Sequence, residues 1–463
     1  MQPRSLLPLA ALLLSAGCTL TPKYTRPAPT IPQAWSSGAE NTGAEVIAAD
    51  TSWQDYFTHP GLQSIIKLAL ANNLDLRVAA LNVEKAQALH RIQRSELLPS
   101  AGVMANGQKM RIPEKVSKDG TVTYTEQYSV NVGVMSWEVD FFGRLRSLKS
   151  RALNQYLATE QARDATQVAL VAAVAQSCFL TVADRENLRL AQATFESQKA
   201  FYDLITKSRE LGVASELELR QAQSQVDAAR ADVARFRGLV AMDQNALDLL
   251  VGTHVPPELL PEGQDATGAL KDVAAGLPGE VLLRRPDIRM AEYQLKGANA
   301  NIGAARAAFF PRVSLTAGIG TMSPDLSSLF ESGTRTWSFT PQIVAPLFAG
   351  GSLWSNLKVA KIDREIAIAQ YQKSIQSAFR EVSDGLIKRT ALVDQLDAQR
   401  SLVEALAVSH RLSEARYKEG LDGYLGVLVA QRSLYGAQQG LVATRLAYQA
   451  NQVTLFKALG GQM

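Results

Sequence analysis

Cysteine and histidine are the residues of this chain that could carry nucleophilic or metal chemistry, and they are few and scattered. The sequence holds Cys18, Cys178, His59, His90, His254 and His410. Two cysteines are too few for a disulfide framework or a four-cysteine zinc site. We find no HExxH, no GxSxG in a strand–turn–helix setting and no Walker loop. The sequence therefore predicts no catalytic residues, no metal ion and no other cofactor, and thus no enzyme.

Cys18 has a different chemistry available because it ends a short export signal. A basic residue, Arg4, is followed by an apolar stretch over residues 6–14 and then by small residues. The run Leu14-Ser15-Ala16-Gly17-Cys18 resembles a bacterial lipobox, which implies removal of residues 1–17 and a lipid on the Cys18 sulfur. An ordinary secreted protein with a chance cysteine is the alternative.

The residues after Cys18 bear on where the chain goes. Thr19, and not Asp, would follow the lipidated cysteine, so the resemblance implies delivery to the outer membrane. Residues 19–50 are rich in Pro, Thr, Ser and Ala, which is typical of an extended tether. We assign residues 18–60 to the lipid anchor and this tether.

Composition excludes several classes of protein. The chain has 463 residues, of which 46% are hydrophobic and 20% charged, with a net charge of +4. This is too apolar for intrinsic disorder, and the mean hydropathy of −0.05 is too low for a polytopic helical membrane protein. The basic excess is small and dispersed, so we expect no nucleic acid as a partner.

Two long segments lack the residues that break helices. Residues 144–211 contain neither proline nor glycine, and residues 352–419 contain only Gly385. A helix of about 68 residues is roughly 100 Å long. Such rods must pack on other rods, because no globular domain buries one alone.

The two rods belong to an internal duplication. Adding 208 to a position maps Gly212 to Gly420 and Gly252 to Gly460, and the offset becomes 212 upstream, where Pro99 matches Pro311. We therefore expect two repeats, residues 61–252 and 286–463, joined by a linker over residues 253–285. Each repeat should hold a helix, two strands, a long rod, a turn at Gly212 or Gly420, and a returning helix.

The strands are predicted from alternating apolar residues. Val313 to Ile319 alternate with small and polar residues, as do Trp337 and Phe339, and repeat one has alternation around Val103 and Val132. Four strands leave open edges, which lipid does not tolerate, and the smallest membrane barrels have about eight strands. If the strands cross a membrane, at least two copies must combine. A small soluble sheet capping a helical bundle is the alternative.

One uncharged stretch imitates a transmembrane helix. Residues 165–183 carry no charge, but the equivalent segment of the second repeat, residues 373–391, carries six charged side chains. Equivalent elements should not differ in whether they cross lipid. We expect residues 165–183 to pack between rods, with Cys178 as a small buried residue.

Several motifs spread over the mature chain point to one family. They are the lipobox, Lys23–Pro27, Asp140–Arg144, Leu283–Asp287, Ala298–Pro311 and Lys457–Gly461. Together they resemble the outer-membrane factor family, which includes TolC, and most closely its NodT-type lipoproteins. The run Ala298–Pro311 is the most specific of these motifs, whereas the Gly-Gly terminus alone is weak.

The resemblance implies an architecture and a function. The fold is expected to be mainly α with a small β part, built from two tandem repeats of long coiled-coil helices and four membrane strands. Three copies would form one β-barrel in the outer membrane and one α-barrel crossing the periplasm. This trimer would be the exit duct of a tripartite efflux pump and give multidrug resistance. Its partners would be a periplasmic adaptor and an inner-membrane transporter, by default of the resistance-nodulation-division type.

The resemblance also assigns roles to the turns at the far ends of the rods. Gly212, Val213, Ala214, Gly420 and Leu421 would meet the adaptor. Plain helix–helix turns without a docking role are the alternative.

The same end must close, because an open pore would leak. Family members close it with an Arg-Tyr pair, here Arg416 and Tyr417, and an acidic residue that this chain replaces with Val429. Valine cannot accept a hydrogen bond from arginine. Closure then depends either on apolar constriction at Leu425 and Val429 or on another partner for Arg416, such as Asp422 or Glu419.

A second function class remains open. A structural or adaptor lipoprotein could bridge the periplasm with its coiled coil and form no pore. The alternating strands, with Trp137 and Trp337 as candidates for an aromatic girdle, argue against it. The exported substrate is not readable from the sequence.

Overall fold

The computed structural model describes residues 19–28, 31–32, 34–35, 51–261, 270–271 and 282–461. This part of the chain is mainly helical with one four-stranded antiparallel sheet, which confirms the expected fold class. It forms two compact units. Unit 1 draws on Met1–Ala28, Asn82–Glu160 and Met290–Tyr371, and unit 2 on Pro29–Leu81, Gln161–Arg289 and Gln372–Met463. The expected signal peptide and Cys18 lie outside the described residues.

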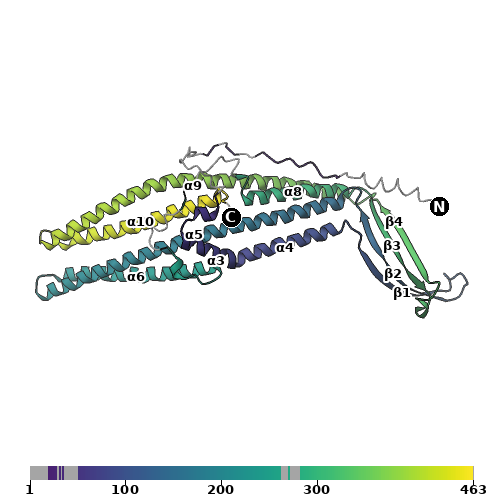
Figure 1. Ribbon diagram of the computed structural model, residues 1–463, viewed down its shortest axis with the longest axis horizontal. Coiled ribbons are helices and arrows are strands. Elements are labelled where there is room, and N and C mark those ends of the chain that lie inside the picture. Colours follow the sequence, from purple (N-terminus) through teal and green to yellow (C-terminus); the bar gives the residue numbers. More distant parts are fainter. Residues whose placement is uncertain are drawn as a thin grey trace. The chain divides into compact units, whose positions relative to one another are not determined.

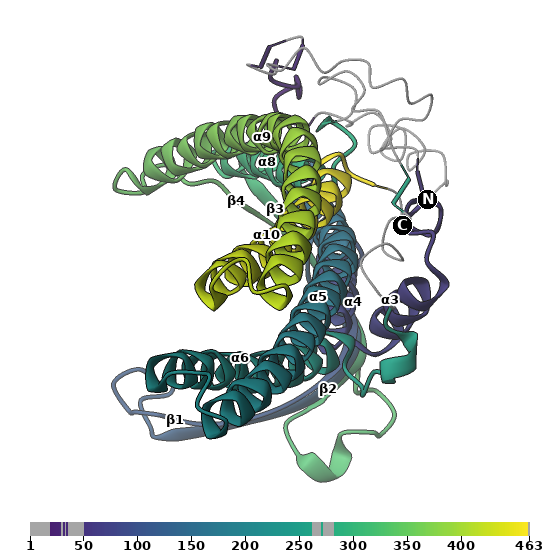
Figure 2. The same cartoon turned by 90° about the vertical axis from the view of Figure 1, so that its left-hand side faces the viewer.

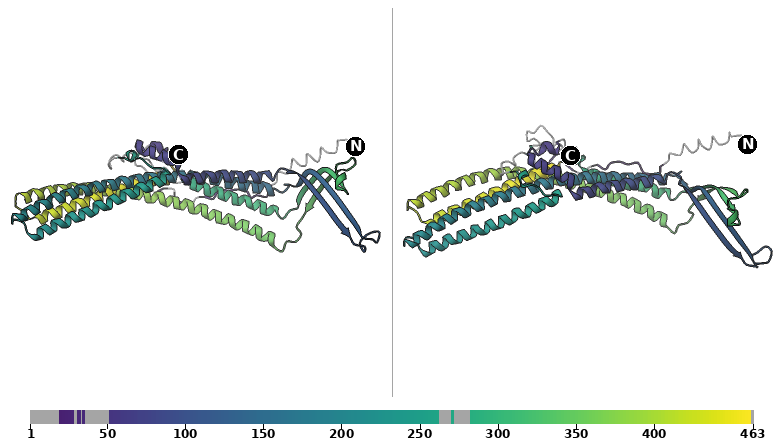
Figure 3. Two further views of the ribbon diagram at one scale, coloured as in Figure 1. Left: turned by 90° about the horizontal axis from the view of Figure 1, so that it is seen from below. Right: turned by 60° about the horizontal axis from the view of Figure 1, so that its bottom comes forward.

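The two rods are helices of equal length. Helix α5 runs over Arg144–Glu210 and helix α9 over Ser352–Lys418, each with 67 residues. Each rod turns back into a shorter helix, α6 over Glu216–Val251 and α10 over Tyr424–Ala458. In unit 2 the hairpins α5–α6 and α9–α10 lie side by side (Figures 1 and 3). Seen from their tips, the four helices follow an open arc (Figure 2).

The duplication holds element by element. Helices α9 and α10 begin 208 positions after α5 and α6, and helix α8, over Pro286–Ala307, begins 212 positions after α4, over Leu74–Ser95. The second strand of each repeat still follows the offset of 212, since β2 begins at Thr123 and β4 at Arg335.

The four extra residues of repeat one therefore lie between the start of β2 and the rod, and not in the strand–strand connection. Strand β2 has an irregularity between Val134 and Trp137, where Ser136 adopts a φ of 49°.

The sheet belongs wholly to unit 1. Its strands are β1, Ala101–Ile112, β2, Thr123–Val139, β3, Arg312–Ser323, and β4, Arg335–Val344, in the order β1-β2-β3-β4 (Figure 1). Strands β1 and β4 are the open edges, which natural sheets normally cover. The predicted alternation located all four strands.

The two faces of the sheet differ in chemistry. One row crosses all four strands through Val103, Val132, Ile319 and Trp337, and these side chains are half or more exposed. The adjacent row, on the opposite face, consists of Gly102, Gly133, Gly318 and Ser338. One face is thus apolar and exposed, and the other is small and polar.

The uncharged stretch of α5 is largely buried. Among the described residues, α5 is the one helix with a segment long and apolar enough for a membrane span, with a mean hydropathy of 1.6, and 56% of that segment is buried inside the structure. Cys178 is fully buried, and burial raises the pKa of its thiol to about 12. The expected internal packing of residues 165–183 is confirmed.

The structure shortens the segment expected to be a tether. Helix α2, Trp53–Tyr56, lies inside residues 18–60, and helix α3, Pro60–Asn72, begins at their end. Tyr56 stacks on Phe456 of α10 with ring centroids 4.4 Å apart. Three closely spaced aromatic residues, Trp53, Tyr56 and Phe57, are buried, so this end of the segment belongs to the core of unit 2.

The N-terminal strap, residues 19–28, does run without helix or strand, as expected for a tether. It lies on α8 in unit 1, where Arg26 holds Glu292 through two hydrogen bonds of 3.0 and 2.8 Å. The Asn299 side chain donates a hydrogen bond to the Pro22 carbonyl. This part of the tether is therefore fixed to the fold.

Candidate docking and gating site at the hairpin tips

Both rods end in the same backbone turn. Gly212 has a φ of 75° and Gly420 a φ of 68°, the left-handed conformation that favours glycine at the end of a helix. The next amide in each turn reaches back five residues, from Val213 to the Ser208 carbonyl and from Leu421 to the Arg416 carbonyl. The duplication thus preserves a Schellman-type turn at both tips of unit 2.

The first tip presents apolar side chains to the surroundings. Leu211 and Val213 are 80% and 81% exposed, while Ala214 packs partly against the core beneath it. Ser215 then caps α6 in a capping box with Glu218. A sharp cap fixes where the exposed segment ends, so the apolar residues sit on a rigid turn.

The second tip carries an ion pair across its turn. The guanidinium of Arg416 donates two hydrogen bonds to Asp422, from Nε to Oδ2 at 2.5 Å and from Nη2 to Oδ1 at 3.0 Å. This hydrogen bonding lowers the pKa of Asp422. Of the two partners considered from the sequence, the structure brings Arg416 to Asp422. The first tip has its own cross-turn pair, Arg209 with Glu216.

The candidate constriction residues are exposed. Leu425 is 64% exposed and Val429 57% exposed, and they lie on one side of α10, four residues apart. Leu421, in the turn before α10, is also 66% exposed. Val429, which stands where the family has an acidic residue, therefore forms an uncovered apolar stripe with Leu425.

An aromatic cluster beneath the tips joins the two hairpins. Phe201 of α5 stacks on Tyr424 with centroids 3.9 Å apart and meets Tyr417 at 5.7 Å. Burial raises the pKa of Tyr424, whose hydroxyl has no hydrogen-bond partner among the described residues. Tyr417 thus packs against Phe201 and Tyr424 of its own chain, while its neighbour Arg416 forms the ion pair with Asp422.

Sequence reasoning missed the residues that hold the hairpins together. Gln198 donates a hydrogen bond to Gln431 at 2.8 Å, and Tyr435 donates one to Asp232 at 3.1 Å. Phe201 was also missed. A signal existed for Gln431, because it matches Gln223 across the duplication, but nothing in the sequence pairs it with Gln198.

The site offers surfaces and contacts and no set of catalytic or metal-binding side chains. Within the described residues, no group of three or more His, Cys, Asp or Glu side chains is placed to hold a metal ion. The tips provide two equivalent turns with exposed apolar side chains, and an ion pair crosses each of them, Arg209–Glu216 at the first and Arg416–Asp422 at the second.

Comparison with known proteins covers nearly the whole chain. The family model for outer membrane efflux proteins matches residues 65–253 and 277–461. A toluene efflux pump outer membrane protein, TtgC of Pseudomonas putida, is 45% identical over 462 residues, which cover 99% of this chain and 96% of TtgC. The cation efflux system protein CusC of Escherichia coli is 38% identical over 466 residues, which cover 100% of this chain and 99% of CusC.

A solved structure agrees with these matches. The open state of the MtrE outer membrane channel of Neisseria gonorrhoeae superposes with a TM-score of 0.87 at 36% identity. The alignment covers 96% of this chain and 98% of the MtrE chain.

Proposed function

The chain belongs to the outer membrane efflux protein family and is the outer-membrane channel component of an efflux pump, and we propose that three copies of it enclose one duct. In this assembly the four strands of each copy close into one membrane barrel. The helical hairpins of each copy supply one third of the wall of a periplasmic cylinder. The bridging lipoprotein that forms no pore does not fit this family.

The sheet of unit 1 carries the proposal. Its row Val103–Val132–Ile319–Trp337 exposes apolar side chains, while the opposite row contains three glycines and a serine. An apolar face suits lipid, and a small polar face suits an aqueous lumen. The edges β1 and β4 leave backbone groups unpaired, at a cost of several kcal/mol for each group in lipid. Pairing β4 of one copy with β1 of the next removes this cost.

The helices support the same assembly. The four helices of unit 2 follow an open arc and do not form a closed ring (Figure 2). The exposed apolar side chains of Leu425 and Val429 on α10 have no cover in the described chain. An arc with an uncovered stripe is what one segment of a cylinder wall should look like. The number three comes from the family resemblance.

A planar bilayer recording tests the channel directly. We expect the purified protein to give discrete, ion-conducting channels, because the lumen face of the barrel is polar. Heat-denatured protein in the same detergent is the control. A folded, membrane-inserted protein that never conducts would exclude the duct and favour a bridging lipoprotein.

We assign the docking of a periplasmic adaptor to Gly212, Val213, Ala214, Gly420 and Leu421. They form the two tips that share one turn geometry, and the exposed apolar side chains there suit a helical hairpin partner. A Cβ atom added at Gly212 or Gly420 would have no neighbouring atom within 4 Å. Both turns therefore leave room for a partner.

We assign closure of the periplasmic end to Arg416, Tyr417, Asp422, Leu425 and Val429. The Arg416–Asp422 pair would hold the second tip in its closed geometry, while the stripe Leu425–Val429 narrows the lumen. An ion pair within one chain replaces the link that the family's acidic residue would make. This accounts for Val429 without leaving Arg416 unpartnered.

The remaining assignments follow from the relatives and the motif around Cys18. We propose a lipid anchor at Cys18 after removal of residues 1–17, and a resistance-nodulation-division transporter as the inner-membrane partner. The repeats are residues 61–252 and 286–463, with a linker over 253–285. Relatives are named for toluene, solvents, antibiotics and cations. The toluene, solvent and antibiotic relatives favour an apolar solvent or drug cargo chosen by the transporter, and the cation relative leaves metal ions as the alternative.

A further inference from the structure

The β1–β2 hairpin extends beyond the four-stranded part of the sheet. The β1–β2 ladder continues to the pair Ile112–Thr123, whereas the β2–β3 ladder ends at Tyr128–Ser323. The last five residues of β1 and the residues 123–127 of β2 that pair with them therefore extend past the end of β3. They form a two-stranded projection at the end of the sheet.

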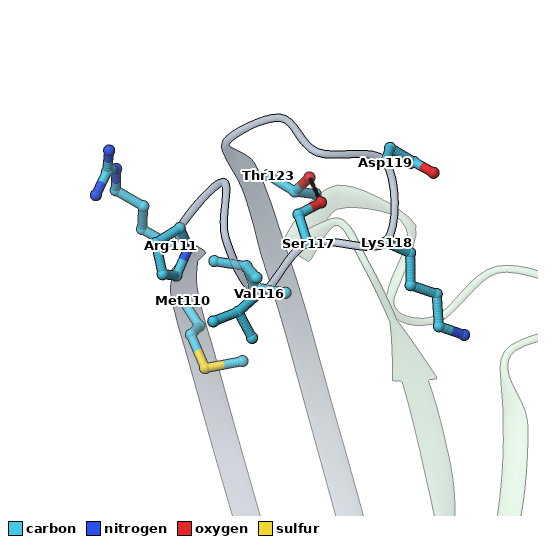
Figure 4. Close-up of a pocket in the computed structure, with 9 residues that line it drawn as sticks. Met110, Arg111, Val116, Ser117, Lys118, Asp119 and Thr123 are labelled. Carbon is cyan, nitrogen blue, oxygen red and sulfur yellow. Dashed lines mark hydrogen bonds between the residues drawn. The ribbon is translucent and has the colours of Figure 1, made fainter.

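A pocket of about 490 Å³ lies in this projection. It is lined by Met110, Arg111, Ile112, Pro113, Val116, Ser117, Lys118, Asp119 and Thr123. Met110 and Val116 lie close together, whereas Arg111 and Lys118 extend outward (Figure 4). Val116 is 72% exposed, and a hydrogen bond between the hydroxyls of Ser117 and Thr123 holds the loop. The pocket is thus an apolar recess whose charged lining residues are Arg111, Lys118 and Asp119.

The β3–β4 connection, residues 324–334, is held by hydrogen bonds of its own and carries uncovered apolar side chains. Ser323 accepts a hydrogen bond from the amide of Asp325, and the Thr334 hydroxyl donates one to the carbonyl of the buried Leu329. Leu326 and Phe330 are 66% and 77% exposed. A fixed loop that presents an aromatic side chain is typical of an interface anchor.

Strand direction brings these two features together when copies combine. All neighbouring strands are antiparallel, so the end of β1 and the start of β4 lie at the same end of the sheet. Closing the barrel by pairing β4 with β1 of the next copy therefore places the β3–β4 connection beside the projection of that copy. This is a head-to-tail contact of the kind that generates a ring.

Charge favours the same pairing. The β3–β4 connection contains Asp325 and Glu331 and no basic residue. Lys109 and Glu126 of the projection pair with each other, which leaves Arg111, Lys115 and Lys118 against Glu114 and Asp119. In the proposed pairing, the acidic connection of one copy would lie beside the more basic loop of the next.

We propose that the pocket of each projection receives Phe330 from the β3–β4 connection of the next copy. The occupant is a second copy of this chain, and the contact fastens the outer rim of the barrel. The inference rests on the proposed assembly of several copies, and it adds the residues that join them outside the strand ladder.

Disulfide trapping between differently tagged copies tests the contact. One copy carries Val116→Cys, or Met110→Cys as a second choice, and the other carries Phe330→Cys. The buried Cys178 should not interfere. We expect oxidation to convert most of the mixed oligomer to a covalent pair bearing both tags. The matched control is Gln127→Cys in place of Val116→Cys, because Gln127 contacts Met322 of its own β3. That combination should give little or no covalent pair.

Two outcomes are distinguishable. If the protein is oligomeric by light scattering, and neither Val116→Cys nor Met110→Cys cross-links to Phe330→Cys above the Gln127→Cys control, the contact is refuted and the duct stands. If the protein is a single-copy species by light scattering, the proposed assembly fails, and the contact fails with it.

Discussion

At the scale of single residues, the Arg416–Asp422 pair is the contact that we propose holds the periplasmic end closed. Both side chains are exposed, so the pair contributes through geometry more than through stability. Arg416 belongs to the last turn of α9 and Asp422 to the following turn. Breaking the pair frees the second tip without disturbing the core.

Arg416→Ala should raise both the mean channel conductance in bilayers and the sensitivity of cells to vancomycin. The expected cause is a looser periplasmic end, since Asp422 loses both hydrogen bonds. Arg209→Ala is the matched control, because it breaks the cross-turn ion pair of the first tip only. If Arg416→Ala conducts like the unmodified protein and excludes vancomycin equally well, the pair does not hold the closed state.

Asp243 is a buried carboxyl whose ionisation opposes folding. Burial, and then the neighbouring carboxyl of Asp184, raise the pKa of Asp243 from 3.8 to about 6. A carboxyl with a raised pKa stabilises the folded state while protonated. This contribution is complete below pH 3.8 and is lost as the pH rises to 6, leaving a cost of about 1–3 kcal/mol at neutral pH.

Asp243→Asn should raise the midpoint of thermal unfolding at pH 7.5 and leave it nearly unchanged at pH 4. The equivalent position of the second repeat is already Asn451. Asp248→Asn is the contrasting variant: burial opposes its charge, but hydrogen bonds from His254, Val255 and Gln244 lower the pKa of Asp248 overall. Asp248→Asn should therefore lower the midpoint of thermal unfolding at pH 7.5. Equal effects of Asp243→Asn at both pH values would refute the argument.

At the scale of elements, the sequence predicted the helices and strands closely because local signals mark their ends. The rods end at glycines that take a left-handed φ, and the strand pattern alternates with period two. The N-terminal segment was less predictable. Tyr56 and Phe57 become part of the core through contacts with Phe456, some 400 residues away, which no local pattern reveals.

In the candidate site, too, the features with a local sequence signal were predictable and the contacts between distant residues were not. Both turns were predicted correctly, since Gly212 and Gly420 match across the duplication. Which partner Arg416 takes was left open, because Asp422 and Glu419 are both close in sequence and only the Schellman-type turn orients the chain toward Asp422. The stacking of Phe201 on Tyr424 depends on how the two hairpins pack, so it was missed.

The proposed docking of an adaptor at the two tips can be tested by substituting their glycines. Gly212→Asp combined with Gly420→Asp should leave the oligomer and its surface level intact and abolish efflux, measured as drug resistance in cells. Aspartate tolerates the left-handed conformation better than most residues, and it places a charge on a surface that would meet an adaptor. Gly238→Asp, on an open part of α6, is the matched control. Normal resistance in the double variant would remove the docking role.

At the scale of the whole molecule, the features that look incomplete in one copy share one explanation. The sheet has open edges and an exposed apolar face, the helices of unit 2 follow an arc, and the tips carry an uncovered stripe. Each would destabilise or aggregate an isolated chain. Assembly of several copies in a membrane accounts for all of them, because the copies pair their strand edges and close the arc while lipid covers the apolar face.

Electron microscopy of the protein purified in mild detergent tests this claim most directly. We predict end-on views with threefold symmetry and a central hollow, and a mass of three chains by light scattering. A stable particle of one chain, with no hollow in any view, would contradict the account.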